Sequence, residues 1–215
     1  MAWGVKIHEV APVSTLIIIQ ARMGSQRLPG KALKPLGGKP SLWWVTEAAR
    51  QVRPVVVAIP GRAEDKLLAR HVASWGIRVF AWPRLRSADV LGRYTACARH
   101  FNADPIIRLT GDCPAHDPDI IRRTLAEFEA KPHDYLFSHW LWDLPRGREV
   151  EVFSRSLLEE AHTRTTDLFD REHVTPWLRR KVGDREARYT GVNLCLDTIE
   201  DYHQLEALWP VSASS

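Results

Sequence analysis

Short runs of apolar residues alternate along this chain with stretches in which apolar residues recur every three or four positions. The first run, Thr15–Ile19, holds five consecutive apolar or β-branched residues, which is typical of a strand buried on both faces of a parallel sheet. The alternation of such strands with amphipathic helices predicts a doubly wound, mostly parallel α/β sheet with right-handed crossovers. Further strands are predicted at Val55–Ile59, Ile77–Ala81, Pro105–Leu109, Tyr135–Ser138, Glu149–Phe153 and Val192–Leu196.

The predicted helices are marked by residues that favour helix ends. Pro40 suits the first turn of a helix that continues to Val52, and Gly76 ends a helix that begins near Leu67. Ser87 is expected to cap the helix that carries Val90 to Phe101. Further helices are predicted after the caps Asp117 and Ser154, as a loop and one short helix within 170–180, and at 199–208.

The domain organisation that follows is simple. We expect an N-terminal extension over residues 1–14, one domain over 15–209 and a tail over 210–215. Within the domain, residues 139–180 are predicted to form a small inserted subdomain.

Composition narrows the class of protein. The chain has 215 residues and a net charge of +4 without a dense basic run, so we expect a small anionic ligand and not nucleic acid. The opening residues lack the apolar core of a signal peptide and no stretch is long enough to span a membrane, so neither secretion nor membrane insertion is expected. Cys97, Cys113 and Cys195 follow no metal-binding spacing and are expected to be free thiols in the cytoplasm.

A basic, glycine-bearing loop follows the first predicted strand. Arg22, Arg27 and Lys31 alternate there with turn-forming residues, and this end of a parallel sheet is where α/β proteins hold phosphate groups. The spacing matches neither G-x-x-x-x-G-K-[ST] nor G-x-G-x-x-G, which disfavours P-loop NTPases and Rossmann dehydrogenases. The alternative is a chance cluster of surface cations. For Lys34 a surface salt bridge is the interpretation kept.

Two aspartates are candidates for holding a metal ion. Asp112 follows Gly111 directly after one predicted strand, and Asp197 follows the last one. Mg²⁺ is normally bound by one or two carboxylates together with phosphate oxygens and water. From the residues alone, a helix-cap or turn role for each aspartate remains open.

Six segments of the chain resemble, in order, the nucleotide-sugar cytidylyltransferases, the family that contains the 3-deoxy-manno-octulosonate and acylneuraminate cytidylyltransferases. The resemblance is greatest to the branch described as spore-coat polysaccharide biosynthesis proteins, and it spans nearly the whole chain from Thr15 to Trp209. The matching segments are Ile17–Pro40, Asp89–Tyr94, Arg108–Pro114, Glu149–Ser154, Asp170–Arg180 and Leu196–Glu206.

The resemblance implies a nucleotide-diphospho-sugar transferase-like fold and a Mg²⁺-dependent transfer of CMP from CTP that releases pyrophosphate. It implies that Asp112 and Asp197 hold the metal and that Arg22, Lys31 and Asp112 are catalytic. A homodimer formed through the inserted segment, which contains the tryptophan-rich stretch 139–142, is also implied. The implied nucleotide-binding residues are Ala21, Arg22, Gly24, Ser25, Arg27, Lys31, Arg108 and Asp112.

Acceptor binding is assigned to Arg148, Glu151 and His173, although a structural role for a lone histidine stays open. Relatives carry Asp-Gly-Leu-Asp in the segment where this chain has Arg-Gly-Arg-Glu at 146–149. The two added cations favour an acceptor more anionic than usual, such as a carboxylated or phosphonylated one, unless they are simply two solvated arginines. Two other functions remain: a glycosyltransferase that uses a finished nucleotide sugar, and a nucleotide-binding scaffold without turnover.

Overall fold

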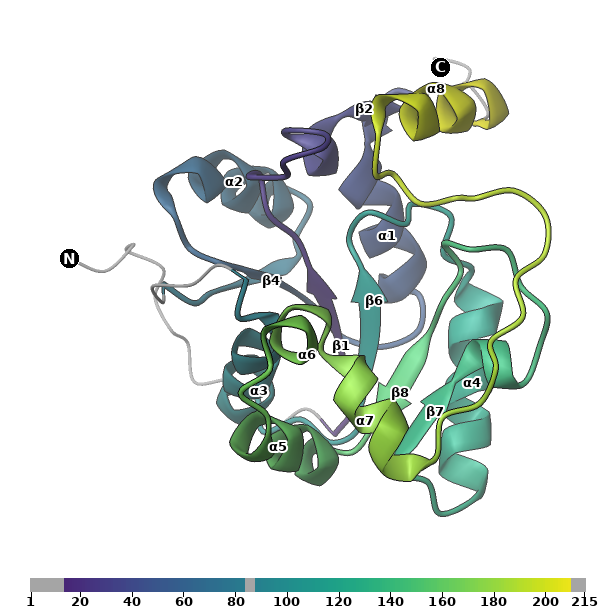
Figure 1. Cartoon of the computed structure of the whole chain (residues 1–215). Coiled ribbons are helices and arrows are strands. Elements are labelled where there is room, and N and C mark those ends of the chain that lie inside the picture. Colours follow the sequence, from purple (N-terminus) through teal and green to yellow (C-terminus); the bar gives the residue numbers. More distant parts are fainter. Residues whose placement is uncertain (1–13, 84–87, 210–215) are drawn as a thin grey trace.

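The computed structural model describes residues 14–83 and 88–209, and its centre is a six-stranded sheet in the order β5-β4-β1-β6-β8-β7 (Figure 1). All neighbouring strands are parallel except at β8, which runs antiparallel to both β6 and β7. This confirms the predicted mostly parallel α/β fold. The strands of this sheet are β1 (Leu16–Gln20), β4 (Val55–Ile59), β5 (Arg78–Ala81), β6 (Ile106–Thr110), β7 (Tyr135–Phe137) and β8 (Glu151–Phe153).

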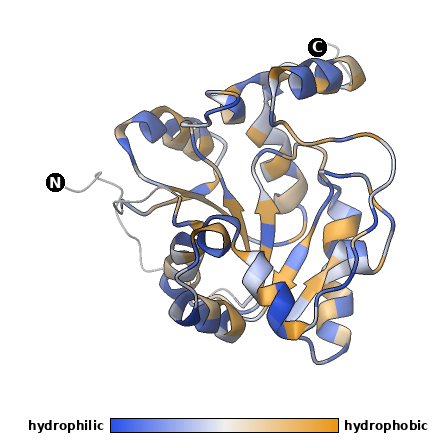
Figure 2. Ribbon diagram, in the orientation of Figure 1, coloured by the Kyte–Doolittle hydropathy of each residue, from blue (hydrophilic) through white to orange (hydrophobic). Residues whose placement is uncertain are grey.

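The central strand β1 is buried on both faces, as its apolar sequence predicts. Ile17 and Ile19 pack into the core beneath α1, α2 and α4, whereas Leu16 and Ile18 pack into the core beneath α3, α5 and α7. Figure 2 shows orange hydrophobic segments along the central strands, with blue hydrophilic segments frequent on the surrounding helices. Because helices cover both faces, ligands can reach the sheet only at the ends of its strands.

Most helices lie where the apolar spacing predicts them. The α-helices are α1 (Ser41–Arg50), α2 (Lys66–Ser74), α3 (Val90–His100), α4 (Pro118–Ala130), α5 (Arg155–Arg164), α6 (Leu168–His173), α7 (Thr175–Val182) and α8 (Ile199–Leu208). Among the described residues, no helix has the length and apolar character needed to cross a membrane. The shorter elements are the 3₁₀ helices η1 (Lys31–Leu33), η2 (Ala63–Asp65) and η3 (Ser138–Trp140) and the small hairpin of β2 (Pro35–Leu36) and β3 (Lys39–Pro40).

Two local predictions are wrong. The segment 170–180 contains most of α6 and α7 and not a loop with one short helix, because Val174 adopts a positive φ of 70° that separates the two helices. Val192–Leu196 is not a strand. Leu194 and Leu196 each donate one isolated backbone hydrogen bond, to the carbonyl oxygens of Arg146 and Asp112, so no ladder with a neighbouring strand forms.

Some predictions concern residues that lie outside the described ranges. The extension over 1–14, apart from its last residue, the proposed cap Ser87 and the tail over 210–215 lie outside the described residues, and the observed cap of α3 is Asp89. Within the segment 139–180, β8 is a strand of the main sheet. The predicted role of that segment in dimerisation stays a prediction.

A buried ion cluster joins the antiparallel strand β8 to its neighbours. Glu151 lies opposite Arg108 in the β6–β8 register and is only 2% exposed. It accepts hydrogen bonds from Arg108, from the Tyr135 hydroxyl and from Arg179 Nη2, the last at 2.6 Å. Burial alone would raise the pKa of Glu151, but the two guanidinium groups outweigh it and lower the pKa from 4.5 to about 2.

We expect Glu151→Gln to remove part of the acid sensitivity of folding. Because the pKa of Glu151 is lower in the folded state, its contribution is present above about pH 4.5 and is lost as the pH falls towards 2. Between these pH values, urea titrations should show the wild-type free energy of unfolding falling by about 2–3 kcal/mol more than that of the variant.

The matched control is Glu159→Gln, which breaks an ion pair between Glu159 and Arg99 on the surface. Exposed pairs contribute little to stability, so its pH dependence should follow that of the wild type. If the free energy of unfolding fell equally with pH in the wild type and in Glu151→Gln, ionisation of Glu151 would not contribute to the acid sensitivity of folding.

Candidate functional site

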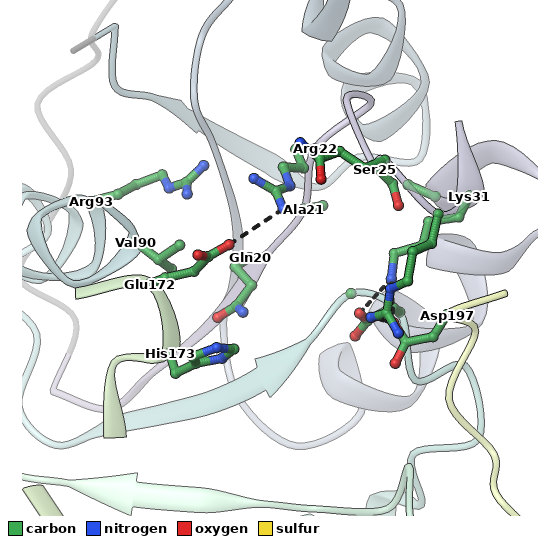
Figure 3. A pocket seen from close by; sticks show the side chains of 15 residues that line it. Gln20, Ala21, Arg22, Ser25, Lys31, Val90, Arg93, Glu172, His173 and Asp197 are labelled. Atoms are coloured by element: carbon green, nitrogen blue, oxygen red, sulfur yellow. Dashed lines mark hydrogen bonds and ion pairs between the residues drawn. The ribbon is translucent and has the colours of Figure 1, made fainter. Parts of the chain in front are cut away.

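A cavity of about 390 Å³ opens where β1 and β6 end, between the basic loop that follows β1 and helices α3 and α6 (Figure 3). It therefore lies at the strand ends where ligands are expected in a sheet of this kind. Most of its lining residues are polar, and they carry both signs of charge. The lining residues are Gln20, Ala21, Arg22, Ser25, Gln26, Arg27, Lys31, Ala32, Val90, Arg93, Gly111, Asp112, Glu172, His173 and Asp197.

The basic loop is held in a defined shape by backbone hydrogen bonds. The Met23 amide donates to Asp65 Oδ1 at 3.0 Å, and the Gly30 amide donates to the Met23 carbonyl at the same distance. Gly30 has a φ of 71°, a conformation that glycine adopts without strain. The chain then enters η1, and Figure 3 shows the side chain of its first residue, Lys31, extending towards Asp197.

The Lys31 ammonium group joins the two aspartates that sequence analysis proposes as metal ligands. Its Nζ lies 2.7 Å from Asp112 Oδ2 and 3.0 Å from Asp197 Oδ1. Arg27 adds a contact of 3.1 Å between its Nη2 and the same oxygen of Asp197. Burial opposes ionisation of Asp112, but the neighbouring ammonium outweighs burial and holds the pKa of this carboxyl below its usual value.

The turn that presents Asp112 depends on a glycine. A Cβ atom at Gly111 would lie 2.5 Å from the carbonyl oxygen of Gln20, a separation that side-chain carbons do not tolerate. The glycine thus allows the end of β6 to pack directly against the end of β1. The Asp112 carbonyl also accepts a hydrogen bond of 2.7 Å from the Leu196 amide, which brings the loop of Asp197 alongside.

Helix α8 fastens the basic loop from outside the cavity. Leu28 and Leu36 pack with Leu196, Tyr202 and Leu205 in a small apolar cluster that is separate from the two main cores. The Tyr202 hydroxyl also donates to the Pro35 carbonyl at 2.8 Å. Figure 1 shows α8 beside β2, so the loop is held between the sheet and this helix.

The opposite wall of the cavity is formed by α3 and α6. Arg22 faces Glu172 across the cavity, with Nη2 and Oε1 3.6 Å apart, and His173 lines the cavity near Gln20 (Figure 3). The two helices are tied together because Arg171 Nη2 lies 2.8 Å from Asp89 Oδ1, an oxygen that also caps α3. This contact fixes the position of the helix α6 that carries His173.

The structure brings together eight of the residues predicted for the site. Gly24 lies in the same loop but beside Glu64, where an added Cβ would be 3.1 Å from that carboxylate. Arg108 and Glu151 belong to the buried ion cluster between the strands and line no part of the cavity. Arg148 lines a different cavity, beside Trp43 and Trp44. The eight residues that line the cavity are Ala21, Arg22, Ser25, Arg27, Lys31, Asp112, His173 and Asp197.

Four polar residues of the cavity, Gln20, Gln26, Arg93 and Glu172, are not among the site residues predicted from the sequence. Gln20 is the last residue of β1, and its buried Oε1 has no hydrogen-bond partner within the described structure. Arg93 is 2% exposed, and burial lowers its pKa to about 10. Arg93 and Glu172 both lie inside segments that carry the family resemblance, and that membership was the signal available for finding them.

The aspartate pair fits a divalent cation. One oxygen from each of Asp112 and Asp197 converges on the same positively charged atom of Lys31, which shows that the two carboxylates can approach a single cation together. Carboxylate oxygens are the ligands that Mg²⁺ prefers. Asp112 and Asp197 are therefore the residues that would hold the metal.

Comparison with known proteins gives a family consistent with this geometry. A family model described as cytidylyltransferase matches residues 16–211. The chain is 34% identical to the spore coat polysaccharide biosynthesis protein SpsF of Bacillus subtilis, over 90% of this chain and 85% of that protein.

Solved structures agree. A cytidylyltransferase from Leptospira borgpetersenii is 29% identical, with a TM-score of 0.79 over 91% of this chain and 86% of that one. A CMP:2-keto-3-deoxy-manno-octonic acid synthetase complexed with CTP, 20% identical, shares the fold with a TM-score of 0.69 over 91% of this chain and 98% of that one. The chain belongs to the cytidylyltransferase family, which makes it a nucleotidyltransferase that uses CTP.

Proposed function

We propose that this protein transfers CMP from CTP to a sugar acid or a similar anionic acceptor, in a Mg²⁺-dependent reaction that releases pyrophosphate. The observation that carries the proposal is the convergence of Asp112 and Asp197 on Lys31, with Arg22 and Arg27 at the same cavity. Two carboxylates for a metal and three cations for a triphosphate are what nucleotidyl transfer requires.

The cations of the basic loop would bind the triphosphate. In nucleotidyl transfer an acceptor oxygen attacks the α-phosphorus in line with the departing pyrophosphate, on which negative charge grows. Arg22 and Arg27 suit phosphate through paired hydrogen bonds, and Lys31 provides a mobile positive charge. Arg22 and Arg27 already line the cavity, and Lys31 would turn from the aspartate pair towards the phosphates when a metal ion takes its place there. Mg²⁺, when bound, supplies further neutralisation of the phosphate oxygens.

The wall formed by α3 and α6 is the proposed acceptor side. His173, Glu172 and Arg93 lie there, away from the aspartate pair (Figure 3). An arginine and a histidine can hold the carboxylate of a sugar acid, and the Glu172 carboxylate can accept hydrogen bonds from its hydroxyl groups. Arg93 is an additional candidate beside the His173 that the sequence indicates. Glu151, by contrast, is already bonded to three side chains and is proposed to hold the sheet together.

The segment 139–180 is proposed to mediate the homodimer. Its helix α6 exposes Leu168 and Phe169, at 65% and 60%, on the surface. Light scattering after size-exclusion chromatography tests this part of the proposal, and a monomeric mass at micromolar concentration would contradict it.

Pyrophosphate release tests the proposed reaction. We expect release from the purified protein with Mg²⁺ to need CTP among the four nucleoside triphosphates, together with one acid from a panel of sugar acids. Asp112→Asn should lower the rate at least about 10²-fold, because a metal ligand loses its charge. The matched control is Asp119→Asn, whose side chain is 79% exposed at the start of α4 and should leave the rate unchanged.

Two results would contradict the reaction. Cleavage of a nucleotide sugar with release of a nucleoside phosphate would identify a glycosyltransferase. Tight CTP binding without turnover across the whole panel would identify a scaffold.

The charge on Lys31 should matter more for turnover than for folding. We expect Lys31→Met to lower kcat by about 10²–10³-fold, the effect usual for removing one stabilising group from a transition state. Lys34→Met is the matched control, because Lys34 lies outside the cavity with its Nζ 5.0 Å from the centre of the Tyr202 ring. Equal loss of kcat in both variants would argue against a specific role for Lys31.

His173 and Arg148 separate two possible acceptor sites. We expect His173→Ala to raise the acceptor KM about tenfold, equivalent to about 1.4 kcal/mol, while the KM for CTP stays within a factor of two. Arg148→Leu should leave the acceptor KM nearly unchanged, because Arg148 lines the other cavity. The opposite pattern would move the acceptor site to the loop at 146–149, as the sequence alone predicts.

A further inference from the structure

Two cysteines that are distant in sequence meet beside the aspartate pair. The Sγ atoms of Cys113 and Cys195 lie 2.8 Å apart, although 82 residues separate them along the chain. Both side chains are buried, at 3% and 7% exposure, and both are free thiols in this structure. Sulfur atoms at this distance are closer than thiols that merely pack together.

These cysteines belong to the two loops that carry the proposed metal ligands. Cys113 follows Asp112 directly, and Cys195 precedes Asp197 by two residues. The loops already touch at this point through the hydrogen bond from the Leu196 amide to the Asp112 carbonyl. A bond between the sulfur atoms would therefore join the loops where they are already in contact.

The surroundings of the pair are polar, unlike those of an inert core cysteine. The Thr110 hydroxyl lies 3.0 Å from Cys113 Sγ, and Glu149 presents a carboxylate oxygen within 4.8 Å of both sulfur atoms. The charged side chain of Arg146 interacts electrostatically with Cys195. In contrast, Cys97 is fully buried in the core beneath α3.

We propose that Cys113 and Cys195 are a disulfide-forming pair, and that their oxidation by a peroxide staples together the two loops that carry Asp112 and Asp197. The Cys195 sulfur attacks one oxygen of hydrogen peroxide and breaks the O–O bond, which gives a sulfenic acid and water. The Cys113 sulfur then displaces the hydroxyl group as a second water. The two thiols lose two electrons in total, and the peroxide gains them.

The distances favour a disulfide over a bound metal ion. Two sulfur atoms on a tetrahedral zinc ion, each at about 2.3 Å from it, lie about 3.8 Å from one another. A disulfide needs about 2.05 Å. From 2.8 Å the sulfur atoms must approach by about 0.75 Å to form a disulfide but separate by about 1 Å to hold zinc, and the disulfide closes the loops in the direction in which they are already hydrogen-bonded.

Mass spectrometry and thermal unfolding test the pair directly. After hydrogen peroxide treatment, denaturation and alkylation, the wild type should carry one alkyl group, on Cys97, in place of three. Peptides containing Cys113 and Cys195 should be cross-linked, and dithiothreitol should reverse the link. Because the bond closes a long loop in the unfolded chain, the Tm of the oxidised protein should rise by about 5–10 °C.

Variants in which one of the three cysteines is replaced complete the test. Cys97→Ala should keep both the cross-link and the rise in Tm, whereas Cys113→Ser and Cys195→Ser should lose both. Three alkylated cysteines after oxidation, sulfinic acids without a cross-link, or a cross-link that lowers the Tm would each overturn the proposal. So would zinc retained by the untreated protein in native mass spectrometry and lost in Cys195→Ser. None of these readouts depends on the proposed transferase activity.

Discussion

Attraction between the Lys31 ammonium and two carboxylates holds together the loops that surround the cavity. Asp112 and Asp197 come from loops that are remote in sequence, and two carboxylates so close together would repel one another without a cation. Lys31 supplies that cation at 2.7 Å and 3.0 Å, and the glycine at 111 lets the underlying strands approach closely enough for the contact. The cavity thus carries a balanced set of charges in which one ammonium group neutralises two carboxylates.

The architecture explains why this balance can be kept rigid. Both faces of β1 are covered by apolar cores, so the strand that leads into the basic loop has no freedom to shift. The loop itself is fastened on its outer side by the apolar cluster of α8. On the opposite wall, the contact between Arg171 and Asp89 fixes α6 against α3. Each wall of the cavity is therefore positioned by packing that lies outside it.

Local sequence pattern was sufficient for the parts of the site that follow directly from strand ends. The basic loop and Asp112 could be predicted because they come immediately after apolar runs, and parallel strands place such positions on one edge. Arg108 and Glu151 show where this reasoning stops. They pair across β6 and β8, and only the order and antiparallel direction of the strands reveals that they are neighbours.

The segment at 192–196 shows a second limit. It has the apolar composition of a strand. A strand also needs an unpaired edge of a sheet beside it, however, and a short stretch of sequence does not reveal whether such an edge is present. Gln20, Arg93 and Glu172 were missed for a related reason. Their roles depend on which elements face one another across the cavity and not on their immediate neighbours in the sequence.

The position of Asp197 just before α8 has a consequence for the newly made protein. A ribosome synthesises the basic loop and Asp112 well before it reaches this residue, and the emerging chain can begin to fold from its N-terminal part. Until α8 has been added, however, the loop lacks its outer support and Lys31 lacks one of its two carboxylate partners. The ion pairs of Lys31 and the outer support of the basic loop should therefore be complete only once the chain through α8 has left the ribosome.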